Sequence, residues 1–232
     1  MAKQKTLLAL GAHYDDCVFG VPGIMLKAIR KNWRVVIVSL IGDYTDWPPI
    51  GNRQRELLEG TVHISGEYGA EMRFLGLKSY SFDVTNETKR AVAEAVADVQ
   101  PDLALMLWKE DHHEDHVVAS HLSRIGLRYP LPLDGGRTAK AVRDVYAYDN
   151  GPRHTIGFQP TDFVDITDEW PQAIAWLGRF MALVRNEPYD ASKLDAAQKT
   201  KEALARYRGI SCGVQYAEAV YAMNARPREI VF

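Results

Sequence analysis

Cysteine is scarce in this sequence, and long apolar runs are absent from it. The 232 residues include only Cys17 and Cys212, which are too few for a dense disulfide framework and favour a reducing compartment. No stretch approaches the roughly 18 apolar residues of a membrane-spanning helix. A short apolar run near the N-terminus leads directly into His13 without a small-residue cleavage site, so we expect a buried strand of a cytoplasmic protein rather than a signal peptide.

An excess of either charge is also missing. The chain has 28 basic and 30 acidic residues, a net charge of -2, and no basic run, so we expect no nucleic-acid partner. Apolar residues make up 47% and charged residues 25% of the chain. This composition is that of an ordinary globular protein and excludes a disordered chain. The length favours one large domain over residues 1–232.

What the sequence does contain is an alternation of apolar runs and segments with helical periodicity. The runs predict buried strands over 6–12, 34–41, 71–75, 103–108, 142–148 and 163–166. The periodic segments predict helices over 21–29, 52–65, 86–99, 116–128, 168–185 and 190–208. This order predicts an α/β fold of the Rossmann-like, doubly wound type, in which a mostly parallel sheet carries helices on both faces.

Two dense groups of potential metal ligands follow two of these strands. His13, Asp15 and Asp16 come directly after the first strand, and the segment 111–116 (DHHEDH) comes after the fourth. In doubly wound sheets, ligands bind beyond the carboxyl ends of the strands, at the point where the strand order reverses. The two strands are neighbours at that point in the common strand orders, so we expect the two groups to meet in space.

The residue types in these groups suit a catalytic metal site. His13 and Asp16 are spaced to converge on one ion from a tight turn, and His116 can supply a third ligand. Such a zinc site keeps a fourth position for water, whose pKa falls to about 7. Asp15 is then free to act as a base. Ferrous iron accepts the same ligands, so the metal stays open between the two.

Each group alone is also compatible with an ordinary solvated, charged loop. Their joint position at the carboxyl ends of two adjacent strands is what favours the metal site. By contrast, His63, His121 and His154 have no ligand neighbours in the sequence, and we expect them to be structural or surface residues. Cys17 follows the acidic pair, and we expect it to be a small buried apolar residue rather than a ligand.

The segments 11–16 (GAHYDD) and 113–116 (HEDH) resemble the signatures Ala-His-Pro-Asp-Asp and His-x-Asp-His of the PIG-L/LmbE-like zinc deacetylases. Weaker similarities to this family are Arg53-x-x-Glu56, the segment 100–102 (QPD) before the fourth strand and the segment 213–218 (GVQYAE). The family includes deacetylases of N-acetylglucosaminyl-phosphatidylinositol, of the mycothiol and bacillithiol pathways and of diacetylchitobiose. The resemblance covers nearly the whole chain.

The resemblance implies a role for each matching residue. The implied zinc ligands are His13, Asp16 and His116. Asp15 is the implied general base, and His113 the residue that stabilises the oxyanion or gives a proton to the leaving amine. Asp115 is expected to orient the imidazole of His116 without itself binding the metal. The implied reaction hydrolyses the N-acetyl amide of a small molecule, such as an amino sugar. Family members often form trimers or hexamers, which also implies a homo-oligomer.

Two prolines of the family pattern are replaced here, one by Tyr14 and the other by Glu114. Proline fixes the backbone angle φ, so its loss affects the rigidity of a loop more than the chemistry of a metal. Every position with a chemical role is intact. We therefore expect the two replacements to alter the loop geometry and the choice of substrate.

Candidate substrate contacts are Arg53, Asp43, Tyr44 and Trp47. The last three lie in the loop after the second strand, on the expected side of the sheet, where an aromatic ring can stack on a sugar. The alternative for the aromatic residues is packing against the neighbouring helix. The alternative for Arg53 is an exposed ion pair with Glu56, one helical turn away.

Two other functions stay open from the sequence. A nucleotide-binding module shares the fold class, but the segment 11–16 replaces the glycine-rich turn, and its two carboxylates repel a pyrophosphate. A catalytically inactive or regulatory metal-binding protein retains the ligands. It has no need of a spare base such as Asp15.

Overall fold

A computed structural model describes residues 3–129, 132–133, 138 and 140–224. Within these residues, seven strands form one sheet in the order β3-β2-β1-β4-β5-β7-β6. The strands are β1 (Thr6–Gly11), β2 (Arg34–Asp43), β3 (Ala70–Lys78), β4 (Leu103–Leu107), β5 (Asp144–Tyr148), β6 (Asp162–Asp165) and β7 (Ala217–Ala222). The helices are α1 (Asp16–Gly20), α2 (Pro22–Arg30), α3 (Gln54–Glu67), α4 (Asn86–Val99), α5 (Glu114–Arg128), α6 (Trp170–Arg185) and α7 (Ala196–Cys212).

Strand β1 is the centre of the sheet. All six of its residues are buried, and it pairs in parallel with β2 on one side and β4 on the other. The chain runs outward through β2 and β3, then returns to β4 and continues outward through β5. The strand order therefore reverses between β1 and β4, which confirms that these two strands are neighbours at the point where such sheets bind ligands.

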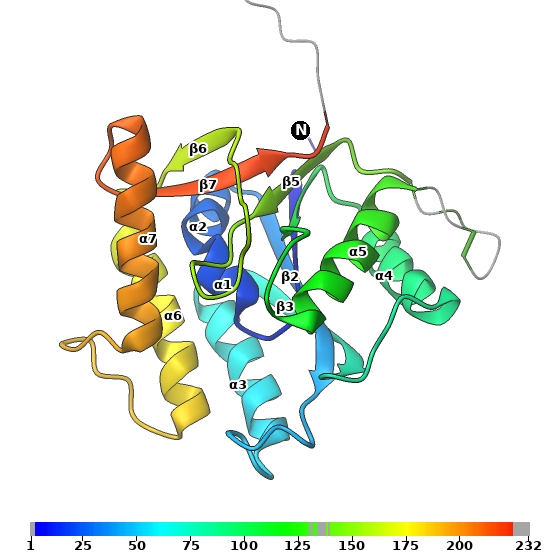
Figure 1. The fold of residues 1–232 in the computed structure, drawn as a ribbon, viewed down its shortest axis with the longest axis horizontal. Helices are drawn as coiled ribbons and strands as arrows, with labels where there is room; N and C mark the ends of the chain where they lie inside the picture. The colour runs from blue at the N-terminus through cyan, green and yellow to red at the C-terminus, as the bar shows by residue number, and fades with distance from the viewer. Residues whose placement is uncertain (1–2, 130–131, 134–137, 139, 225–232) are drawn as a thin grey trace, which may run out of the picture.

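The helices cover both faces of the sheet, as the sequence predicts. Figure 1 shows α4 and α5 together on one face, and α1, α2 and α3 on the other. Helix α6 packs against α2 and α3, and α7 packs against α6 and β7. No helix in the described part of the chain combines the length and the apolar character needed to cross a bilayer.

Residues at the ends of the helices explain where several of them begin and end. Helix α4 begins at a capping box, in which the Thr85 hydroxyl accepts from the backbone of Thr88 and the Thr88 hydroxyl accepts from the backbone of Thr85. It ends at Gln100, which has a φ of 52° and directly precedes a proline. Helix α7 begins later than predicted, because Asp195 and Gln198 form a second capping box there.

The far edge of the sheet differs from the prediction. The strand predicted over 163–166 is present as β6, but the sequence analysis assigned no strand to 217–222. These residues form β7, which lies between β5 and β6 and is antiparallel to both. The sheet is therefore parallel from β3 to β5 and antiparallel beyond β5.

Candidate metal and catalytic site

The turn between β1 and α1 fixes two of the predicted ligands. One oxygen of Asp16, Oδ2, accepts hydrogen bonds from the backbone N–H groups of Ala12 (2.8 Å) and His13 (2.7 Å). The other oxygen, Oδ1, accepts a hydrogen bond from Nδ2 of Asn150 at 2.8 Å. Gly11 is required in this turn, because a Cβ atom there would lie 2.9 Å from the Cβ atom of Asp16. The carboxylate of Asp16 is thus held in one orientation.

The three predicted ligands meet in space. Nδ1 of His13 lies 3.1 Å from Nε2 of His116 and 3.7 Å from Oδ2 of Asp16. Nε2 of His116 lies 3.2 Å from Oδ1 of Asp16. Zinc bonds of about 2.0–2.1 Å at tetrahedral angles place neighbouring donor atoms about 3.3 Å apart. The donor types and their separations therefore fit a zinc-sized ion.

A carboxylate holds the far nitrogen of each imidazole. Nε2 of His13 lies 3.2 Å from Oδ2 of Asp115, and Nδ1 of His116 lies 3.0 Å from Oδ2 of Asp111. We expected Asp115 to orient His116, but the structure places it on His13 instead. Asp115 and His116 are adjacent in the first turn of α5, and adjacent residues on a helix point in different directions. The sequence analysis assigned no role to Asp111.

Neighbouring carboxylates raise the pKa of each of the two imidazoles. Burial lowers the pKa of His13, but hydrogen bonds to Asp115 and Asp16 outweigh it and raise that pKa above its ordinary value. Burial also lowers the pKa of His116, but Asp16 and Asp111 outweigh burial and raise that pKa above its ordinary value. Burial raises the pKa of Asp16, but the neighbouring His116 and His13 outweigh burial and hold that pKa well below its ordinary value. The cluster therefore keeps its negative charge on the carboxylates.

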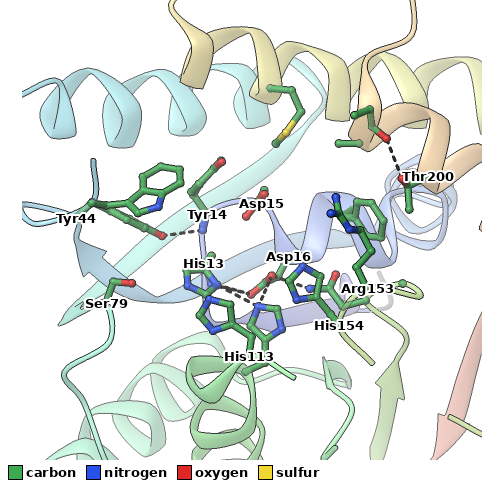
Figure 2. Close-up of a pocket in the computed structure, with 18 of the residues that line it drawn as sticks. His13, Tyr14, Asp15, Asp16, Tyr44, Ser79, His113, Arg153, His154 and Thr200 are labelled. Carbon is green, nitrogen blue, oxygen red and sulfur yellow. Dashed lines mark hydrogen bonds and ion pairs between the residues drawn. The ribbon is translucent and has the colours of Figure 1, made fainter. Parts of the chain in front are cut away.

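Asp15 lies beside the three ligands but does not belong to them. Figure 2 shows Asp15 apart from His13 and Asp16, toward Tyr14 and the interior of the pocket. Burial and the neighbouring charge of Asp16 raise the pKa of Asp15 to about 6. A carboxylate with a pKa near neutrality is suited to accept a proton from water and to release it again.

His113 stacks against two neighbouring rings. Its ring stacks on that of His116, with centroids 4.8 Å apart, and on that of Tyr80, with centroids 5.2 Å apart. Burial and the neighbouring His13 and His116 lower the pKa of His113 to about 4. Its buried Nδ1 atom has no hydrogen-bond partner among the described residues. His113 is thus a neutral imidazole at neutral pH, with unused hydrogen-bonding capacity.

These groups line a pocket of about 510 Å³. Its volume lies within the usual range for small-molecule sites, roughly 300–1,000 Å³. The three predicted ligands and Asp15 are among the residues that line it. Its aromatic lining residues include Tyr14, Tyr44 and Trp47, and the loop after β5 contributes Asn150, Arg153 and His154.

This aromatic lining accounts for the first replaced proline. The ring of Tyr14 packs against those of Tyr44, Trp47 and Phe180, with centroid distances of 5.9, 6.0 and 6.3 Å. Its backbone N–H donates to the hydroxyl of Tyr44 at 2.9 Å. Tyr14 is therefore anchored by packing rather than by a proline ring, and it brings an apolar surface beside Asp15. The predicted residues Tyr44 and Trp47 both line the pocket.

The second replaced proline lies at the start of a helix. Glu114 is the first residue of α5, and its side chain is exposed. The first helical position tolerates many residues because its backbone N–H needs no partner within the helix, and a negative charge there is favourable for the helix dipole. The exchange therefore leaves α5 and its ligand His116 in place.

Two of the predicted substrate contacts are placed elsewhere. The guanidinium of Arg53 donates to the backbone carbonyls of Leu183 (3.2 Å) and Val184 (2.7 Å), and it lies 3.6 Å from Glu56. The two carbonyls lie in the last turn of α6, so Arg53 connects the start of α3 to the end of α6. It is absent from the lining of the pocket. Asp43 lines a smaller neighbouring cavity, where it accepts from the backbone of Thr45.

Among the pocket residues that were not predicted from the sequence are Asn150 and His154. Asn150 supports Asp16, and His154 lies with its Nδ1 atom 3.7 Å from Asp111. Both directly follow β5, so the strand-end rule that found the first two groups also applies to them. We predicted His154 to be a structural or surface residue. The other predictions of this kind are confirmed: Cys17 is buried, and His63 and His121 are exposed.

The family model PIG-L, described as GlcNAc-PI de-N-acetylase, matches residues 8–125. The chain belongs to the PIG-L family. The matched residues run from β1 into α5, so they include both groups of ligands.

Three solved structures share the fold of this chain. The 4-carboxy-2-hydroxymuconate hydratase GalB from Pseudomonas putida is 19% identical, with a TM-score of 0.77, and the match covers 99% of this chain and 100% of GalB. A conserved protein from Thermus thermophilus is 21% identical, with a TM-score of 0.73 and coverages of 97% and 96%. The N,N'-diacetylchitobiose deacetylase from Pyrococcus horikoshii is 17% identical, with a TM-score of 0.76 and coverages of 94% and 84%.

Proposed function

We propose that this PIG-L family protein is a zinc-dependent hydrolase that removes the acetyl group from an N-acetylated small molecule, such as an N-acetylglucosamine-type sugar or glycoconjugate. The observation that carries the proposal is the spacing of the three ligand atoms of His13, Asp16 and His116, with a separate carboxylate, Asp15, beside them. A purely structural zinc site is closed by four protein ligands and has no need of such a base.

The proposed reaction breaks the amide bond between the acetyl group and the amine by addition of water. A zinc ion bound by the three ligands supplies a Lewis acid that polarises the acetyl carbonyl and makes water more acidic. Asp15 takes a proton from the attacking water, which its pKa of about 6 allows at neutral pH. The same proton is then available for the amine that leaves.

His113 is suited to the charge that develops on the acetyl oxygen. Its pKa of about 4 keeps the ring neutral, and a neutral imidazole donates a hydrogen bond from one nitrogen. A donor aimed at the developing oxyanion lowers the barrier, commonly by a factor of roughly 100 to 1,000 in rate. The stacked rings of Tyr80 and His116 restrict the rotation of His113, so little reorganisation is needed during the reaction.

The pocket supports a sugar-sized substrate. Trp47 is half-buried in the lining of the pocket, and such a ring packs well against the C–H face of a pyranose. The de-N-acetylase family model and the similarity to a diacetylchitobiose deacetylase agree with this choice. We propose zinc as the metal, although ferrous iron accepts the same donor set.

The hydratase GalB has the same fold, so the fold alone does not fix the reaction. Addition of water to a carbon–carbon double bond also needs a base such as Asp15, but it releases no amine. The assay must therefore detect amine release, with loss of an unsaturated substrate measured in parallel.

The test combines metal analysis with an activity assay. The purified protein is analysed for zinc and iron beside Asp16→Ala and the control Asp168→Ala, whose side chain is 80% exposed. We expect about one equivalent of metal in wild type and control, and its loss in Asp16→Ala. Zinc-loaded wild type is then assayed for amine release from N-acetylglucosamine and N,N'-diacetylchitobiose. Metal-free protein that cannot be loaded with zinc or iron would overturn the ligand assignment and the hydrolase mechanism.

A further inference from the structure

Asn150, directly after β5, connects its loop to one of the proposed metal ligands. Nδ2 of Asn150 donates to Oδ1 of Asp16 at 2.8 Å, and the same oxygen lies 3.2 Å from Nε2 of His116. The other oxygen of Asp16 is fixed by backbone N–H groups of its own turn. The position of the oxygen that faces His116 therefore depends on where the loop holds Asn150.

A buried acid precedes Asn150 and anchors the turn. Asp149 is buried, and its Oδ1 atom accepts from the backbone N–H of Gly151 at 2.9 Å. The backbone N–H of Asn150 donates to Oγ1 of Thr155 at 2.8 Å. Gly151 has a φ of 91°, and a Cβ atom there would lie 2.9 Å from the ring of Phe19. Because the turn is so closely packed and bonded, a shift of Asp149 moves Asn150 with it.

The positive charge that faces Asp149 comes from a helix far away in sequence. Nη2 of Arg208, near the end of α7, donates to Oδ2 of Asp149 at 2.5 Å. The two side chains are only 13% and 8% exposed. The guanidinium also lies over the rings of Phe158 (5.4 Å) and Tyr207 (5.2 Å), which restrict its position. A buried carboxylate is costly without a cation, so Asp149 depends on Arg208.

The geometry of Arg208 favours a positioning role over a purely stabilising one. Its Nε atom is buried and has no hydrogen-bond partner among the described residues. A buried donor without an acceptor destabilises a fold. Such an arrangement is expected where the direction of one guanidinium N–H group matters more than the number of hydrogen bonds. In this structure that group points at Asp149.

We propose that Arg208 is a positioning residue of the metal site, which acts through Asp149 and Asn150 to hold Oδ1 of Asp16 toward the metal. The proposal rests on the ligand assignment of the proposed function and adds to it a determinant of metal affinity on α7. Arg208 is absent from the lining of the pocket, so its effect reaches the metal through a chain of three contacts.

Zinc affinity, measured without any substrate, tests this chain of contacts. Metal-free wild type, Arg208→Met and Asn150→Ala each compete for zinc with a chromogenic chelator. Groups that orient a ligand change metal affinity by roughly 10- to 100-fold, and we expect this range for Asn150→Ala and its lower end, about tenfold, for the more remote Arg208→Met. Arg206→Met is the matched control, because Arg206 lies on the same helix, is 52% exposed and pairs with Glu202. Wild-type affinity in a folded Arg208→Met protein would overturn the proposal.

A double variant tests whether Arg208 acts through Asn150. Once Asn150 is replaced by alanine, a movement of the loop no longer reaches Asp16. Arg208→Met/Asn150→Ala should therefore bind zinc as weakly as Asn150→Ala alone, since two residues of one network do not contribute independently. A merely structural role of Arg208 predicts a lower melting temperature without such coupling. Losses of affinity that multiply in the double variant would overturn the proposal.

Two further variants separate positioning from folding. Arg208→Lys keeps the charge and should recover part of the zinc affinity that Arg208→Met loses. Where Arg208→Met does not fold, Asp149→Asn/Arg208→Met carries the test, because asparagine still accepts from Gly151 and no charge is left buried. We expect this neutral pair to fold and to bind zinc about tenfold more weakly than wild type. Wild-type zinc affinity in the folded neutral pair would overturn the proposal.

The proposal and the proposed function fail in different ways. If zinc-loaded wild type releases no amine from the N-acetylated sugars while Arg208→Met binds zinc more weakly, the positioning role stands and the deacetylase function falls. If wild type releases amine while Arg208→Met keeps wild-type zinc affinity, the function stands and the positioning role falls.

Discussion

The carboxylate of Asp111 lies 3.0 Å from Nδ1 of His116, across the ring from the Nε2 atom that faces Asp16. Asp115 holds His13 in the same manner through its Nε2 atom. Each imidazole can therefore give its outer N–H to a carboxylate, which would leave its inner nitrogen for the proposed metal. This arrangement fixes the tautomer of each ring and increases the basicity of the inner nitrogen.

Removing either outer charge should weaken metal binding. We expect Asp111→Asn and Asp115→Asn each to reduce zinc affinity by roughly 10- to 100-fold, because asparagine keeps the shape but accepts less strongly from the imidazole. Affinity is measured by competition with a chromogenic chelator. Glu110→Gln is the control, because Glu110 is 51% exposed and pairs with Lys109. An unchanged affinity in both asparagine variants would show that the two carboxylates do not support the ligands.

Zinc binding should release a proton near neutral pH. The pKa values of His13 and His116 are raised in the metal-free protein, but their facing nitrogens lie only 3.1 Å apart, so one of these atoms must accept from the other. The pair therefore holds one proton between its inner nitrogens, and zinc must displace it. Calorimetry at pH 7 in buffers of different ionisation enthalpy measures the release. Binding that is independent of the buffer would contradict this prediction.

The same raised pKa values determine how the metal-free fold responds to pH. A histidine whose pKa is higher in the folded than in the unfolded state stabilises the fold fully below its ordinary pKa of about 6.5, and this contribution is lost as the pH rises through the raised value. Metal-free protein should therefore lose stability above neutral pH, which urea denaturation at a series of pH values measures. Loading with zinc removes the proton and should abolish that loss.

A buried ion pair joins the C-terminal elements to the start of α2. Nζ of Lys201 donates to the carbonyl of Gly20 (2.8 Å) and to Glu218 (2.9 Å), and Glu218 accepts from the N–H groups of Gly23 (3.0 Å) and Ile24 (2.8 Å). Both charged side chains are at most 2% exposed. Lys201→Met leaves the carboxylate buried without its cation, and we expect a loss of about 3–5 kcal/mol in the free energy of unfolding.

Urea denaturation measures this loss, with Lys199→Met as the control. Lys199 lies on the same helix but is exposed, so its replacement should change stability by less than about 0.5 kcal/mol. The double variant Lys201→Met/Glu218→Gln removes both charges and should recover part of the loss. A Lys201→Met protein as stable as the control would show that Glu218 does not depend on Lys201.

The central strands were predictable and the far edge was not, for a physical reason. Strands buried on both faces read as continuous apolar runs, which identified β1, β2 and β4. Strand β7 is short and contains Glu218, whose burial depends on a lysine 17 positions away in sequence. No local pattern reveals such a pair.

The same distinction applies to the site. The two signature segments contain the three predicted ligands and the predicted base, and the strand-end rule was sufficient to predict that the two segments meet in space, as they do. The partner of each imidazole depended on the rotation of α5, so Asp115 was assigned to the wrong ligand and Asp111 was missed. Asn150 and His154 enter the site through tertiary packing of the loop after β5, and isolated polar residues in a sequence give no such information.

A single substitution distinguishes the proposed role of Asp15 from that of the three proposed ligands. Asp15→Asn retains the shape of the side chain but cannot take a proton from water, and we expect turnover to fall by a factor of roughly 100 to 10,000. Zinc content should stay near one equivalent, because the ligand atoms belong to His13, Asp16 and His116. Both quantities are measured on the same preparation, beside Asp168→Asn as the exposed control. Loss of zinc together with turnover would make Asp15 a ligand, and unchanged turnover would exclude it as the base.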